Sequence, residues 1–132
     1  MVYRVFISHS FRDQDLAAKV GDFVRRSGAQ VIDEALEADD QSARNITEGL
    51  RQSNEIILVV TRHSAMNPWL YWEIGRASAL GKQITPVVEG IEPSDLPPPL
   101  NNLEAVRANS IEELREGLSE RMASITVGNR DH

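Results

Sequence analysis

Short apolar runs alternate along the chain with segments in which apolar residues recur every three to four positions. The runs are rich in β-branched residues and predict strands, whereas the periodic segments predict amphipathic helices. Strand–helix alternation at this spacing predicts βαβ units and a parallel sheet. The expected strands cover residues 2–7, 30–32, 55–61, 83–88 and 103–108.

Polar and glycine residues at the ends of the periodic segments predict where the helices begin and end. Asn67 followed by Pro68 is the strongest of these signals, because it joins an N-cap to a proline in the first turn. It predicts a helix over residues 69–80. The expected N-caps are Asp13, Ser42, Asn67 and Ser110, and the expected helix stops are Gly28 and Gly81.

Five strands in a chain of this length predict an α/β fold with a flavodoxin-like, doubly wound parallel sheet of order 2-1-3-4-5, flanked by helices. In that order the topological switch lies between the first and third strands, and ligands bind outside their carboxyl ends. Two loops, 8–12 and 61–68, therefore meet at one crevice. We expect one domain over residues 1–124 and a flexible tail over 125–132.

Composition narrows the class of protein further. The 132 residues fit one domain, and the absence of cysteine excludes disulfides, thiolate zinc sites and cysteine nucleophiles. The longest apolar run, 56–60, is too short to span a bilayer, and no signal peptide is recognisable. A net charge of −6 disfavours nucleic-acid binding. We therefore expect a cytoplasmic protein that binds neither membrane nor nucleic acid.

Much of the negative charge lies in one segment, residues 33–41, which carries no basic residue. A solvated loop and a partner-facing surface are both open interpretations of this segment. A calcium loop fits poorly, since the spacing differs from the EF-hand pattern and glycine is missing. The acidic residues are Asp33, Glu34, Glu37, Asp39 and Asp40.

Several kinds of active site are excluded at the predicted crevice. Residues 8–12 contain no glycine, so neither a Rossmann nor a P-loop phosphate site is present, and no G-x-S-x-G motif occurs. His9 and His63 fall at the crevice and His132 ends the chain, but no pair has the spacing of metal ligands. No metal site is therefore expected.

The start of the helix over 69–80 is the most informative place. Trp69 and Glu73 are four residues apart and share one helix face, with Trp72 beside them. Two plainer interpretations stay open: Glu73 and Arg76 could form an exposed ion pair, and the tryptophans could be core residues.

These residues resemble a known family. VFISHSFRD, which begins at Val5, resembles the first motif of TIR (Toll/interleukin-1 receptor/resistance) domains, and TRHSAMNPWLYWEIGRA, from Thr61, resembles their third-strand exit and following helix. In enzymatic members a Trp is followed four residues later by Glu, as Trp69 is by Glu73. Residues 33–41 fall where the family has its BB loop, and 45–53 resemble its second helix. The resemblance covers about residues 2–124.

The resemblance implies an NAD⁺ glycohydrolase or cyclase that cleaves the nicotinamide–ribose bond and forms ADP-ribose or a cyclic product in immune or anti-phage signalling. Glu73 would be the catalytic residue, and NAD⁺ would be substrate, with no cofactor. One carboxylate suffices, because nicotinamide leaves from a pyridinium and needs no proton. The implied substrate-binding residues are Ser8, Ser10, Phe11, Arg12, Ser64 and Trp69. Two of them also have plainer interpretations, because Phe11 could form a hydrophobic staple with the first helix and Arg12 could be a solvated loop residue.

Two departures from the family pattern affect these expectations. Leu70 follows the Trp and Trp72 precedes the Glu, and this bulk could change the choice of substrate and product. The acidic segment 33–41 is a poor neighbour for a pyrophosphate, so we expect it to contact another TIR copy in a homo-oligomer. The alternatives are a non-catalytic TIR adaptor that acts through TIR–TIR contacts and an enzyme similar to nucleoside deoxyribosyltransferases.

Overall fold

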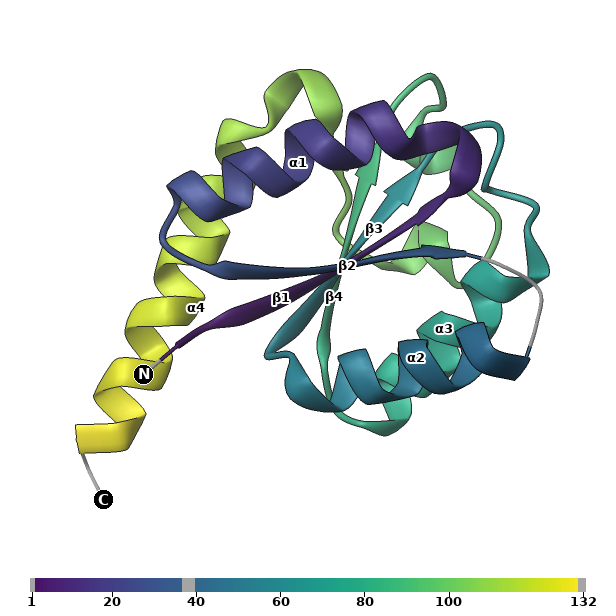
Figure 1. The fold of residues 1–132 in the computed structure, drawn as a ribbon. Helices are drawn as coiled ribbons and strands as arrows, with labels where there is room; N and C mark the ends of the chain where they lie inside the picture. The colour runs from purple at the N-terminus through teal and green to yellow at the C-terminus, as the bar shows by residue number, and fades with distance from the viewer. Residues whose placement is uncertain (1, 37–39, 131–132) are drawn as a thin grey trace.

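The computed structural model describes the backbone of residues 2–36 and 40–130 and the side chains of residues 2–32 and 44–125. Its centre is a five-stranded parallel sheet of order β2-β1-β3-β4-β5, which confirms the predicted flavodoxin-like class and strand order. Helices α1 and α4 cover one face of the sheet, and α2 and α3 cover the other (Figure 1). The strands are β1 (Arg4–Ser10), β2 (Gln30–Leu36), β3 (Glu55–Val60), β4 (Gln83–Val88) and β5 (Val106–Arg107). The helices are α1 (Gln14–Arg26), α2 (Asp40–Gln52), α3 (Pro68–Ala79) and α4 (Glu112–Arg130), with short 3₁₀ turns at Phe11–Asp13, Pro93–Asp95, Leu100–Asn102 and Ala108–Ser110.

The central strands β1 and β3 are buried on both faces, and alternate residues therefore enter two separate cores. Phe6 packs in the core beneath α2 and α3, while Val5 and Ile7 pack in the core beneath α1 and α4. The same alternation directs the Ser8 side chain toward the face covered by α2 and α3, so its hydroxyl can contact a residue of α3.

The start of α3 agrees with the capping signals in the sequence. The Asn67 side-chain oxygen accepts a hydrogen bond from the Trp69 backbone N–H at 3.0 Å, and Pro68 is the first helical residue. Gly81 follows the helix with a φ of +68°, in the left-handed region that glycine enters at little cost. The start of α3 is therefore set locally, because the capping residue and the proline lie within its first turn.

The second strand is longer than expected. We predicted a strand at 30–32 followed by an acidic loop, but β2 continues to Leu36 and pairs with β1 throughout, with Asp33 opposite Ile7 and Glu34 opposite Ser8. Backbone pairing with β1 extends an edge strand whatever the charge of its side chains, and edge strands commonly carry charges. Helix α2 likewise begins at Asp40, two residues before the expected cap.

The C-terminal elements also differ from the prediction. The last strand, expected over 103–108, is reduced to Val106–Arg107, because residues 103–105 form no regular structure and a 3₁₀ turn begins at Ala108. The final helix begins at Glu112 and extends to Arg130, past residue 124, where we expected the domain to end.

A buried polar cluster fastens α4 to the amino ends of the strands. The Glu55 carboxylate is completely buried, and Arg121 of α4 donates to both of its oxygens at 2.8 and 2.9 Å. The Tyr3 hydroxyl donates to the same carboxylate at 2.5 Å. Burial, together with the Glu55 charge, raises the pKa of Tyr3 well above its usual value. The cluster lies at the opposite end of the sheet from the predicted crevice.

Candidate active site

Glu73 and Ser8 contact each other near the carboxyl end of β1, the end of the sheet where the sequence predicts the crevice. Both side chains are completely buried, and the Ser8 hydroxyl donates a hydrogen bond of 2.7 Å to the Glu73 carboxylate. Ser8 is near the carboxyl end of β1, and Glu73 is in the second turn of α3. A buried carboxylate with a hydroxyl donor has a restricted orientation, which suits a group that must face developing charge.

The alternative of an exposed ion pair between Glu73 and Arg76 is wrong. The Glu73 side chain has no exposed surface, whereas Arg76 is exposed and its guanidinium lies over the Trp72 ring, 5.7 Å from the ring centroid. Trp69 and Trp72 are half-buried and meet edge to face, with centroids 5.2 Å apart. Both pack against the core beneath α2 and α3, so the alternative in which the tryptophans are packing residues agrees with the structure.

Asp13 joins the segments that follow β1 and β3, a role that the sequence did not suggest. One oxygen of its buried carboxylate accepts hydrogen bonds from the Ser10 hydroxyl and from the Thr61 hydroxyl, each at 2.8 Å. The Thr61 hydroxyl in turn accepts from the His63 backbone N–H at 3.1 Å. Asp13 precedes α1 as expected, but its side chain makes no capping bond. The sequence offered one weak signal for this contact, because polar residues follow both β1 and β3.

The other predicted binding residues divide into buried and exposed groups. The Ser10 hydroxyl bonds to Asp13, and the Ser64 hydroxyl accepts from the Thr61 backbone N–H at 3.0 Å. Phe11, in contrast, is 68 % exposed, which excludes the hydrophobic staple, and Arg12 is also exposed. Binding of substrate by these residues stays a prediction.

The two histidines near the ends of β1 and β3 lie in different surroundings. Nδ1 of the buried His9 lies 2.9 Å from the Ser10 carbonyl oxygen, and His63 is exposed. Among the residues that the structure describes, no three His, Asp or Glu side chains are grouped so that they could hold an ion. Of the acidic segment, Glu37 and Asp39 lie outside the described residues. The side chains of Asp33, Glu34 and Asp40 do so as well.

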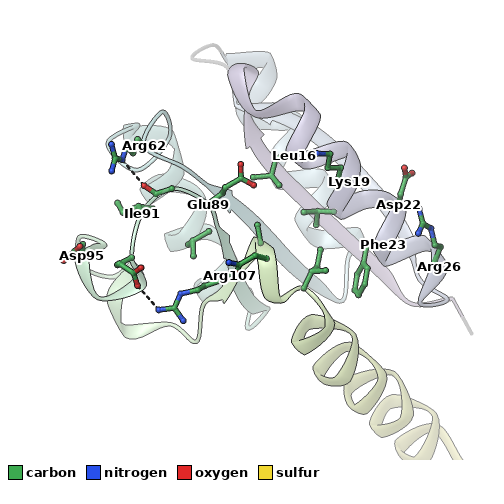
Figure 2. Close-up of a pocket in the computed structure, with 17 residues that line it drawn as sticks. Leu16, Lys19, Asp22, Phe23, Arg26, Arg62, Glu89, Ile91, Asp95 and Arg107 are labelled. Atoms are coloured by element: carbon green, nitrogen blue, oxygen red, sulfur yellow. Dashed lines mark hydrogen bonds and ion pairs between the residues drawn. The ribbon is translucent and has the colours of Figure 1, made fainter.

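A large hollow lies away from Glu73, between α1 and the loops that follow β4 and β5 (Figure 2). Its volume is about 830 Å³, and Glu73 does not line it. Leu16 and Phe23 of α1 contribute apolar surface, and charged residues of both signs surround them. Two of its cations are already engaged: Arg62 donates to the Gly90 carbonyl oxygen at 2.9 Å, and Arg107 donates to Glu92 at 2.7 Å.

The fold and this site define a doubly wound α/β domain with a buried carboxylate at the topological switch point. The chain belongs to the TIR domain family, since the model of that family matches residues 5–122. No curated protein sequence matches the chain. In the described part of the chain, no helix combines the length and the apolar character needed to cross a bilayer.

Solved structures share this fold at low sequence identity. The TIR domain of the Toll-related receptor TRR-2 from Hydra magnipapillata is 19 % identical, with a TM-score of 0.66 over 93 % of this chain and 97 % of that one. The TIR domains of the activated Roq1 resistosome are 16 % identical, with a TM-score of 0.55 over 70 % and 60 % of the two chains. The CMP N-glycosidase BcmB from Clostridium botulinum is 21 % identical, with a TM-score of 0.58 over 87 % and 97 %.

Proposed function

We propose that this TIR domain cleaves the bond between nicotinamide and ribose in NAD⁺ and acts in immune or anti-phage signalling. The observation that carries the proposal is the buried Glu73 carboxylate, which accepts a hydrogen bond from the Ser8 hydroxyl near the carboxyl end of β1. Glu73 is the catalytic residue in this proposal, and Ser8 positions its carboxylate. NAD⁺ is the substrate, and no cofactor is needed.

The chemistry fits a single carboxylate. As the N-glycosidic bond breaks, its electron pair goes to the pyridinium nitrogen, nicotinamide leaves neutral, and positive charge develops on the ribose carbon. The Glu73 carboxylate would stabilise that charge. Water then adds to the carbon and loses a proton, which gives ADP-ribose. Attack by a nucleophile from the same molecule would give a cyclic product instead.

The burial of Glu73 means that the proposed mechanism requires a conformational change. The carboxylate has no exposed surface in this conformation, so substrate reaches it only after neighbouring segments move. Self-assembly of TIR domains would supply such a change, and a solved neighbour consists of TIR domains in an activated resistosome. The expected contact between copies uses the acidic residues of the segment 33–41. The isolated domain should accordingly have low activity that rises with protein concentration.

Two observations favour other functions. The burial of Glu73 suits a non-catalytic adaptor that acts through TIR–TIR contacts. The similarity to a CMP N-glycosidase supports the same bond cleavage on a different nucleotide, because CMP also joins its base to ribose through nitrogen. The released base separates these possibilities: NAD⁺ cleavage releases nicotinamide, CMP cleavage releases cytosine, and an adaptor releases neither.

The test measures release of nicotinamide from NAD⁺ and of cytosine from CMP by chromatography, over a range of protein concentrations and with a crowding agent. We expect nicotinamide release that Glu73→Gln abolishes, since the amide carries no negative charge. Glu89→Gln is the matched control, because Glu89 is exposed and lines the hollow beside α1. Release of neither base under any condition would support the adaptor. Full activity of Glu73→Gln would remove Glu73 from the mechanism.

A further inference from the structure

A second, smaller hollow lies between α2 and α3, on the outer side of the helices. It has a volume of about 360 Å³, and we call it the arginine groove. Three of its lining residues are arginines, and the only carboxylate among them is Glu48. The lining residues are Arg44, Thr47, Glu48 and Arg51 from α2 and Trp72 and Arg76 from α3.

The charge of the arginine groove is opposite to that of the chain. Three guanidinium groups against one carboxylate give the groove a net positive charge, while the whole chain has a net charge of −6. Glu48 is also engaged beside the groove, because its carboxylate accepts a hydrogen bond from the Gln52 amide at 3.0 Å. A local excess of arginine on an acidic protein favours binding of an anion.

Helix geometry explains only part of this cluster. Arg51 and Arg76 lie in the last turns of α2 and α3, where a cation interacts favourably with the helix dipole. Arg44 lies two turns before Arg51 on the same stripe of α2, so the dipole does not account for it. The register of α2 therefore brings Arg44 to the groove independently of the helix end.

One guanidinium of the arginine groove is already restrained. Arg76 lies over the Trp72 ring at 5.7 Å from its centroid, and this contact reduces the freedom that Arg76 would lose on binding a ligand. Guanidinium groups match phosphate oxygens with paired hydrogen bonds. Three of them around one small hollow suit a ligand with two adjacent phosphate groups better than one with a single charge.

From this arrangement we infer that the arginine groove binds a diphosphate, either free or as part of a nucleotide. The site lies on the outer side of α3 and is separate from the buried Glu73 carboxylate on the sheet side. Binding here does not depend on NAD⁺ cleavage. Trp72 lines the groove and contacts Trp69, so the tryptophan fluorescence of the chain should change when the groove is occupied.

The test titrates the intact chain with pyrophosphate, ADP and sulfate at low ionic strength and follows tryptophan fluorescence and calorimetric heat. We expect pyrophosphate to bind with a Kd below about 1 mM and to weaken as salt is added. The double variant Arg44→Gln/Arg51→Gln should raise the Kd about tenfold or more, as should Arg76→Gln. ADP binding tighter than pyrophosphate would support a nucleotide as ligand, and the reverse order would support the free diphosphate.

The matched control is Arg4→Gln/Arg25→Gln, which removes two exposed arginines outside the groove and leaves the net charge equal to that of the double groove variant. Its Kd should stay within about twofold of the unmodified chain. Three results would overturn the inference: no binding of pyrophosphate, equal binding of sulfate, or equal weakening in the groove and control variants. None of them bears on Glu73, so the proposed catalytic activity is tested separately.

Discussion

Loss of Arg121 should destabilise this domain more than loss of any exposed ion-pair partner. Arg121→Met removes both guanidinium hydrogen bonds from the completely buried Glu55 carboxylate and leaves the Tyr3 hydroxyl as its described partner. Removing one member of a buried pair costs about 3–5 kcal/mol, because a charge stays buried without compensation. The Arg121 side chain is 28 % exposed, so water can partly replace it, and we expect the lower end, about 3 kcal/mol.

The assay is urea denaturation at neutral pH, supported by thermal melting, where about 3 kcal/mol corresponds to a decrease in Tm of roughly 10 °C for a domain of this size. Arg107→Met is the matched control. Arg107 and Glu92 are 2.7 Å apart but 55 % and 63 % exposed, so breaking this pair should cost less than about 1 kcal/mol.

A second variant distinguishes the buried charge from simple loss of packing. Glu55→Gln/Arg121→Met leaves a neutral amide in place of the carboxylate, so it should recover at least about 1 kcal/mol relative to Arg121→Met alone. The reasoning is refuted if Arg121→Met and Arg107→Met destabilise the domain equally, or if the double variant is less stable than Arg121→Met.

Three further predictions concern stability. Gly75→Ala should stabilise the domain by about 0.5–1 kcal/mol, because Gly75 lies within a helix and a Cβ there would meet no atom within 4 Å. Gly49→Ala should destabilise the domain, because its Cβ would lie 2.3 Å from the Phe6 ring. Equal effects of the two variants in urea denaturation would contradict this reasoning. Asp13→Ala should cost about 2–3 kcal/mol by leaving two buried hydroxyls without their acceptor, and a loss below 0.5 kcal/mol in the same assay would argue against it. Because the folded-state pKa of Tyr3 is raised above its usual 10, the free energy of unfolding should fall as pH rises above 10, and Tyr3→Phe should give a flatter profile there; parallel profiles would exclude Tyr3 as the cause.

For the proposed reaction, the buried Glu73 carboxylate must first become accessible to substrate. Glu73 is held by Ser8 from β1, so any movement that exposes it must either shift α3 or break that hydrogen bond. Asp13 meanwhile joins the loop after β1 to the residue after β3, which limits how far these two crevice segments can separate. The Tyr71 hydroxyl also donates to the Ala65 carbonyl oxygen, which ties α3 to its preceding loop.

Features that depend on neighbouring residues were predicted well. The start of α3 follows from Asn67 and Pro68, which act within one helical turn. The strand β3 follows from an unbroken apolar run, and the parallel order follows from strand–helix alternation. Predictions failed where pairing with a distant segment extends or shortens an element, as in β2, whose pairing with β1 reaches Leu36.

The sequence by itself therefore indicated the fold class, the strand order and the positions of the loops after β1 and β3. Periodicity and capping are local properties that locate the elements, and strand–helix alternation predicts a doubly wound parallel sheet. Only the tertiary structure decided which side chains meet there. Ser8 and Glu73 are 65 positions apart, and no pattern along the chain states that one donates to the other. The burial of Glu73 and the convergence of arginines from α2 and α3 on one groove likewise depend on how the helices pack against the sheet.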